Sequence, residues 1–105
     1  MSQEINNQAA YSYVTTTASV LAFAGKGVLH TVAQGQNDAL PTAGSVTIYD
    51  NASTNAGRVL YTTYWPAAAF KPSSVTLDIE VSNGVYIYFD TTGDVSLTVT
   101  FKEES

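Results

Sequence analysis

Apolar and polar residues alternate with a period of two in three consecutive runs toward the C-terminus. In the first run, "SVTLDIEV" at 74–81, the apolar members are every second residue from Val75 to Val81. The runs "VYIYF" at 85–89 and "VSLTVTF" at 95–101 repeat the pattern. Because successive side chains of a β-strand point to opposite faces, this period predicts three strands that each bury one face.

Further runs rich in β-branched and aromatic residues predict strands at 11–18, 20–25, 25–33, 45–50 and 58–64. Gly, Asn, Asp or Pro stand between them, as turns require. A chain of about seven to eight short strands of this kind is typical of an all-β, single antiparallel β-sandwich, jelly-roll-like or immunoglobulin-like. We predict one such domain over 11–105, preceded by a flexible polar arm at 1–10. The expected core includes Val46, Ile48, Leu77, Ile79, Ile87, Leu97 and Val99.

Residues 82–84, Ser-Asn-Gly, separate the first two alternating runs. A two-residue loop would pair Val81 with Tyr86 and so place an apolar face beside a polar-tipped one. A three-residue hairpin loop instead pairs Val81 with Val85 and gives Gly84 the positive φ that such loops need. The pattern therefore predicts a hairpin with this register, in which Glu80 faces Tyr86 and Asp78 faces Tyr88.

Size and charge narrow the classes of partner. A chain of 105 residues is long enough for one core, and the lack of cysteine leaves no disulfide or thiolate metal site. The net charge of −5 disfavours nucleic acid and anionic membranes as partners. The first ten residues lack the basic and apolar segments of a secretory signal, and no run is long enough to span a bilayer. We therefore expect a soluble product of the cytosol, and no cofactor.

Three groups of residues are candidates for a chemical site. His30, the single histidine, lies in a predicted strand. A hydrolytic triad would need a Ser and an Asp from other segments to converge on it, and the sequence contains no G-x-S-x-G motif that would supply the nucleophile. Two loops could hold calcium, one through Asp90 and Asp94 and the other through Asp50 with Asn51 and Asn55. Neither has the dense ligand pattern of an EF-hand, so turn chemistry explains them. Asp78 and Glu80 have the character of surface charge rather than a glycosidase pair. We predict that the protein is not an enzyme, and that His30 is structural or interfacial.

Aromatic residues are the remaining signal. The chain has seven tyrosines and one tryptophan, and the alternation places Tyr86 and Tyr88 on an outer face. Tyrosines either cover a sheet face or anchor an interface, where they bury a large area at low entropic cost. Both interpretations fit the sequence. The candidate interface residues are Tyr86, Tyr88, Trp65 and His30.

Three segments in this order carry a family resemblance: "GKGVLHTVAQGQ", "GSVTIYDNASTNAGRVL" and "DIEVSNGVYIYFDTTGDVSLTVTF". Together they resemble small β-sandwich virion proteins of tailed bacteriophages, over about Gly25 to Phe101. The stretch "YWPAAAFKP" at 64–72 departs from that pattern by its bulk. The shared motifs are architectural, and the family has no catalytic residues to carry over.

The resemblance implies a non-enzymatic component of the virion, of the capsid decoration type, synthesised in the cytoplasm of the host bacterium. Its expected partner is the major capsid protein or another virion protein, and a homo-oligomer is expected, with a trimer matching threefold positions of an icosahedral shell. The alternative is a carbohydrate-binding or receptor-binding module of a tail or head fibre. In that case Tyr86, Tyr88 or Trp65 would stack on sugars beside Asp78 and Glu80.

Overall fold

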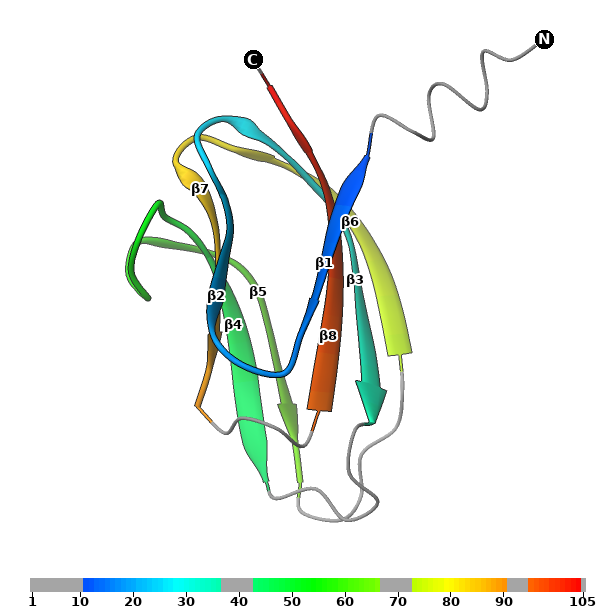
Figure 1. The fold of residues 1–105 in the computed structure, drawn as a ribbon. Coiled ribbons are helices and arrows are strands. Elements are labelled where there is room, and N and C mark those ends of the chain that lie inside the picture. The colour runs from blue at the N-terminus through cyan, green and yellow to red at the C-terminus, as the bar shows by residue number, and fades with distance from the viewer. Residues whose placement is uncertain (1–10, 37–42, 67–72, 91–94, 105) are drawn as a thin grey trace, which may run out of the picture.

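The computed structural model describes residues 11–36, 43–66, 73–90 and 95–104, and all regular secondary structure in these ranges is β-strand (Figure 1). The predicted arm at 1–10 lies outside the described residues. The strands are β1 Ser12–Thr16, β2 Val20–Ala24, β3 Gly27–Gln36, β4 Gly44–Asp50, β5 Arg58–Trp65, β6 Ser73–Val81, β7 Gly84–Phe89 and β8 Val95–Glu103.

The strands form two four-stranded sheets that face each other (Figure 1). Sheet A has the order β1-β8-β3-β6, and sheet B has the order β2-β7-β4-β5. All neighbouring strands are antiparallel. The prediction of an all-β antiparallel sandwich is therefore confirmed.

The core lies between the sheets and follows the two-residue alternation. β4, β7 and β8 each bury every second side chain completely or nearly so, because they lie inside their sheets. The predicted core residues Val46, Ile48, Ile87, Leu97 and Val99 are all fully buried. Leu77 and Ile79 pack against this core but are only partly buried, since β6 is an edge strand.

The predicted hairpin between β6 and β7 is wrong. β6 pairs with β3 in sheet A, whereas β7 lies between β2 and β4 in sheet B, so residues 82–84 cross from one sheet to the other. Val81 pairs with Gly27, and Val85 pairs with Phe23. Alternation shows which face of each strand is apolar. It cannot tell whether two apolar faces lie side by side in one sheet or opposite each other across a core.

Gly84 nevertheless has the predicted positive φ, at 148°. A Cβ at this position would lie 2.6 Å from the backbone oxygen of Phe23 and 2.8 Å from that of Asn51. Both distances are far below van der Waals contact, so the crossing between sheets needs glycine for space as well as for conformation.

The predicted connection of β4 and β5 through "NASTNAG" is confirmed, and the two strands form a hairpin. Asn51 organises its loop. The Oδ1 atom accepts hydrogen bonds from the backbone N–H groups of Ser53 and Thr54, and the Nδ2 atom donates one to the carbonyl of Ala56. These are the contacts expected of Asn in a turn.

Replacing Leu97 by alanine tests the core. Leu97 is fully buried in β8, so its truncation is expected to lower the free energy of unfolding by about 3 kcal/mol, from lost burial and the cavity left behind. Leu21→Ala, at a side chain that is 38% exposed, should cost much less. Thermal and urea unfolding measure both variants. Equal melting temperatures for Leu97→Ala and wild type would contradict this core.

Candidate interaction surface

The outer face of sheet B carries a row of four large side chains, one from each strand. The register places Leu21 of β2 beside Tyr86 of β7, Tyr86 beside Tyr49 of β4, and Tyr49 beside Val59 of β5. Leu21 and Val59 are exposed, at 38% and 51%, and the two central tyrosines are half-buried. The row therefore crosses the entire sheet.

A second row lies beside the first on the same face. Tyr88 of β7 pairs with Thr47 of β4, which pairs with Thr62 of β5. The hydroxyls of Thr47 and Thr62 are 3.0 Å apart. Tyr64, further along β5, is 69% exposed. We call these outward residues the tyrosine face: Leu21, Thr47, Tyr49, Val59, Thr62, Tyr64, Tyr86 and Tyr88.

The prediction that Tyr86 and Tyr88 point outward is confirmed, but their predicted neighbours are wrong. Asp78 and Glu80 lie on β6 in the other sheet, because β6 and β7 are not paired. Tyr49 and Tyr64 were not singled out by the sequence. Alternation within "SVTIYD" and "RVLYTTY" offers a signal for both, since each lies on the face opposite to buried residues of its strand.

The structure separates the other two candidate interface residues from this face. Trp65 is 2% exposed and packs in the core, where its ring lies 6.4 Å from that of Phe89. A role for Trp65 as an exposed platform is therefore wrong. Its neighbour Tyr64 points the other way, as alternation along β5 requires.

His30 belongs to a separate cluster on sheet A. β3 pairs with β6 on one side and with β8 on the other, and both pairings shift register between Leu29 and Thr31. His30, the residue between them, therefore lies at a bulge. Its Nδ1 atom lies 2.5 Å from Oδ1 of Asp78, and its ring stacks on Tyr11 with centroids 4.3 Å apart. Asp78 has φ of +50°, a left-handed conformation that Asp tolerates better than most residues. The cluster fastens β3, β6 and the start of the described chain together.

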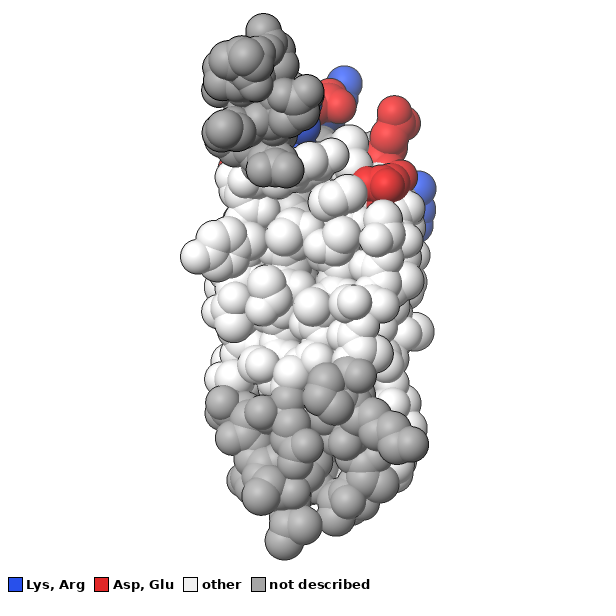
Figure 2. Space-filling view, turned by 90° about the vertical axis from the view of Figure 1, so that its right-hand side faces the viewer, with Lys and Arg blue, Asp and Glu red and all other residues white. Residues whose placement is uncertain are grey.

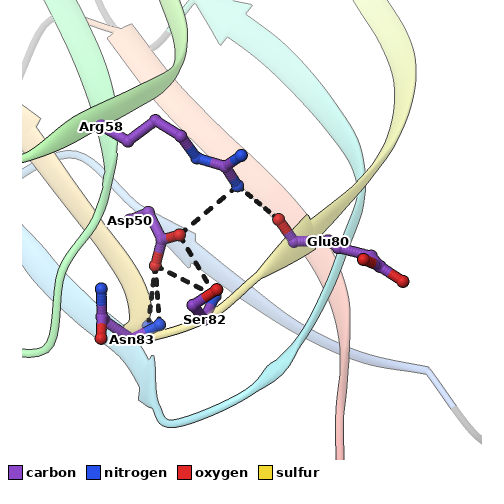
Figure 3. A network of polar contacts seen from close by, with 6 residues as sticks. Asp50, Arg58, Glu80, Ser82 and Asn83 are labelled. Atoms are coloured by element: carbon purple, nitrogen blue, oxygen red, sulfur yellow. Dashed lines mark hydrogen bonds and ion pairs between the residues drawn. The ribbon is translucent and has the colours of Figure 1, made fainter.

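A buried carboxylate, that of Asp50, joins the two sheets (Figure 3). Asp50 ends β4, and its oxygens accept hydrogen bonds from the backbone N–H groups of Ser82, Asn83 and Gly84 at 2.7–3.3 Å. Nη2 of Arg58 lies 3.4 Å from Oδ2 of Asp50 and donates to the carbonyl of Glu80. One carboxylate and one guanidinium thus hold the crossing between the sheets, and we call Asp50 and Arg58 with these contacts the clamp.

The charge of Asp50 is maintained by these contacts. Burial by itself would raise the pKa of this carboxyl, but the backbone hydrogen bonds from residues 82–84 and the nearby Arg58 outweigh it and lower the pKa below its usual 3.8. The carboxylate oxygens are occupied by protein donors, as turn chemistry requires. The sequence signal for this burial is that Asp50 follows Val46 and Ile48 at two-residue spacing on the inward face of β4.

Charged side chains gather at one end of the sandwich, as Figure 2 shows for one side of the molecule. The charged residues of the described chain, apart from Asp90, are Lys26, Asp50, Arg58, Asp78, Glu80, Lys102, Glu103 and Glu104. A pocket of about 230 Å³ opens there, lined by Lys26, Gly27, Glu80, Val81, Ser82 and Glu104. Among the described residues no cluster of three or more potential metal ligands occurs. Away from this end, the described parts of the two outer sheet faces carry few charged side chains.

Asp90 lies apart from that charged end. It follows β7 and links the end of this strand to Ser45 of the neighbouring strand β4. Its carboxylate accepts hydrogen bonds from the backbone N–H and the hydroxyl of Ser45, at 2.7 and 3.1 Å. Asp94, its predicted companion, lies outside the described residues.

No protein-family model matches the chain, and neither a curated protein nor a solved structure matches it significantly. In the described ranges no helix has the length and apolarity needed to cross a bilayer. The resemblance to phage virion proteins therefore stays a prediction.

Proposed function

We propose that this chain is a non-enzymatic structural protein of a tailed bacteriophage virion, a decoration protein that binds the major capsid protein. The observation that carries the proposal is the tyrosine face, a row of aromatic and aliphatic side chains across all four strands of sheet B. Tyrosine is enriched at the energetic centres of protein interfaces, and charged side chains are depleted there.

The fold supports this role in a second way. The tyrosine face is presented on a sandwich whose strand pairing and buried core fix the positions of its side chains, so little conformational entropy is lost on binding. Many copies on one shell would add modest individual contacts through multivalency.

The alternative function is a glycan-binding or receptor-binding module, but the residues predicted to form its binding site do not lie together. Trp65 is buried, and Asp78 and Glu80 belong to the sheet opposite to the one that carries Tyr86 and Tyr88. Tyrosines alone could still stack on sugar rings. The experiment below separates the two functions.

Particles assembled without the chain test the proposal. We expect them to form but to release DNA at lower temperature than complete particles, and purified protein should restore their resistance. The double variant Tyr86→Ser/Tyr88→Ser should fold, as circular dichroism can verify, yet bind the particles at least about tenfold more weakly. Tyr13→Ser, at a 72% exposed tyrosine on sheet A, is the matched control and should bind normally.

Two results would overturn the proposal. One is that particles lacking the chain are as heat-resistant as complete ones, and adsorb poorly to cells, which favours the receptor-binding alternative. The other is that the double variant restores resistance as well as wild type does, which removes the tyrosine face from the interface.

A further inference from the structure

The edge strand β6 leaves an inward-facing valine uncovered. Val75 pairs with the buried Val32 and points to the same side of sheet A, yet it is 37% exposed. The other apolar side chains of the described residues with comparable exposure on paired strands, Tyr13, Leu21, Val59 and Tyr64, all point outward. Val75 therefore faces the core side of sheet A, but the described parts of the chain leave its side chain partly exposed to solvent.

Only part of the β6 edge is protected against pairing with a further strand. Toward its end, Asp78 interrupts the regular strand with a left-handed residue at a bulge, and the carbonyl of Glu80 accepts a hydrogen bond from Arg58. Bulges, charges and occupied backbone groups are the devices by which edge strands avoid pairing with other strands. Ser73–Thr76, before the bulge formed by Leu77 and Asp78 opposite His30, has none of them. It contains no charged residue and no proline, and all four of its residues are exposed.

We propose that Ser74–Thr76 pairs with the same segment of a second copy of this chain, antiparallel, about a twofold axis at Val75. In this register Val75 meets Val75 of the second copy, and Ser74 meets Thr76. The inward valines cover each other, and the serine–threonine pairs can form hydrogen bonds across the junction. Sheet A of each copy becomes half of one continuous sheet.

A second copy fits this edge better than an unrelated partner for two reasons. The segment is complementary to itself, as a closed twofold interface requires. In addition, two chains of net charge −5 repel each other unless their charges are kept apart. Most charged residues of the described ranges lie at the end of the sandwich that begins at the Asp78 bulge. The proposed pairing ends before this bulge, so it brings only uncharged side chains together. The inference rests on the edge of sheet A and does not depend on the function of the tyrosine face.

Sedimentation equilibrium of the purified full-length chain tests the pairing. We expect a concentration-dependent monomer–dimer equilibrium. Val75→Lys should shift it at least about tenfold toward monomer, because two lysines would meet at the axis, while the melting temperature of dilute monomer stays close to wild type. Tyr13→Lys, at an exposed tyrosine on the outward face of β1, the other edge strand of sheet A, is the matched control and should dimerise normally.

A cysteine cross-link reports the register directly, since the chain contains no other cysteine. Val75→Cys should form a disulfide-linked dimer under mild oxidation, because paired positions at the axis bring the Cβ atoms close to disulfide range. Thr15→Cys, on the edge strand β1 at the opposite side of sheet A, should not.

Several outcomes would overturn the proposal. These are a monomer at all concentrations, a trimer, efficient cross-linking only through Thr15→Cys, or a dimer that Val75→Lys leaves intact. A large fall in the melting temperature of monomeric Val75→Lys would also overturn it, since Val75 would then be covered within its own chain.

Discussion

Replacing Asp50 by alanine is expected to lower the free energy of unfolding by about 4 kcal/mol, because the backbone donors that the carboxylate binds lose their acceptor. Asp50 is 5% exposed and accepts hydrogen bonds from Ser82, Asn83 and Gly84. Arg58 also loses its ion-pair partner. Urea unfolding measures the loss.

Asp50→Asn is the informative partner variant, since it keeps the shape and one acceptor oxygen but removes the charge. It should be less stable than wild type and more stable than Asp50→Ala. Asp90→Asn is the matched control, because that carboxylate also accepts backbone and hydroxyl hydrogen bonds but is exposed. If Asp50→Ala is as stable as wild type, the clamp between the sheets contributes nothing to the free energy of unfolding.

The same carboxylate gives a pH dependence with a defined sign. The pKa of Asp50 in the folded state lies below 3.8, so its contribution is complete above that pH and is lost as the pH falls through the lowered folded-state value. The stability difference between wild type and Asp50→Asn should therefore be constant near neutrality and shrink below about pH 4. A difference that grows in acid would contradict the lowered pKa.

Gly84→Val is expected to be the most damaging single substitution, with a loss of more than about 4 kcal/mol or failure to fold. The new Cβ would meet the backbone oxygens of Phe23 and Asn51 at 2.6 and 2.8 Å. Neither oxygen can move without displacing its strand or loop. A φ of 148° adds strain for a β-branched side chain.

Ser82→Val controls for the hydrophobic and β-branched character of the change two residues away. Ser82 uses its backbone N–H in the clamp and leaves its side chain exposed, so this variant should unfold close to wild type. Soluble expression and thermal melting compare the two proteins. Similar melting temperatures for Gly84→Val and Ser82→Val would contradict the close approach at Gly84.

The sequence by itself determined the class of fold and the inner face of almost every strand. Side chains alternate strictly along a strand, so Val46 and Ile48, or Leu97 and Val99, share a face whatever sheet their strand joins. The same rule placed Tyr86 and Tyr88 outward. These inferences are local, since they depend only on spacing along one strand.

Tertiary structure decided which strands are neighbours, and with them the composition of every surface. β6 and β7 are adjacent in sequence but lie in different sheets, because two apolar faces can bury each other across a core as well as side by side. As a result, Asp78 pairs with His30 and does not lie beside Tyr88. Sheet order also places Tyr49 beside Tyr86, and it brings the carboxylate of Asp50 into contact with the backbone of residues 82–84. Each of these contacts joins residues far apart in sequence, whose proximity depends on sheet order, and periodicity within a strand contains no information about that order.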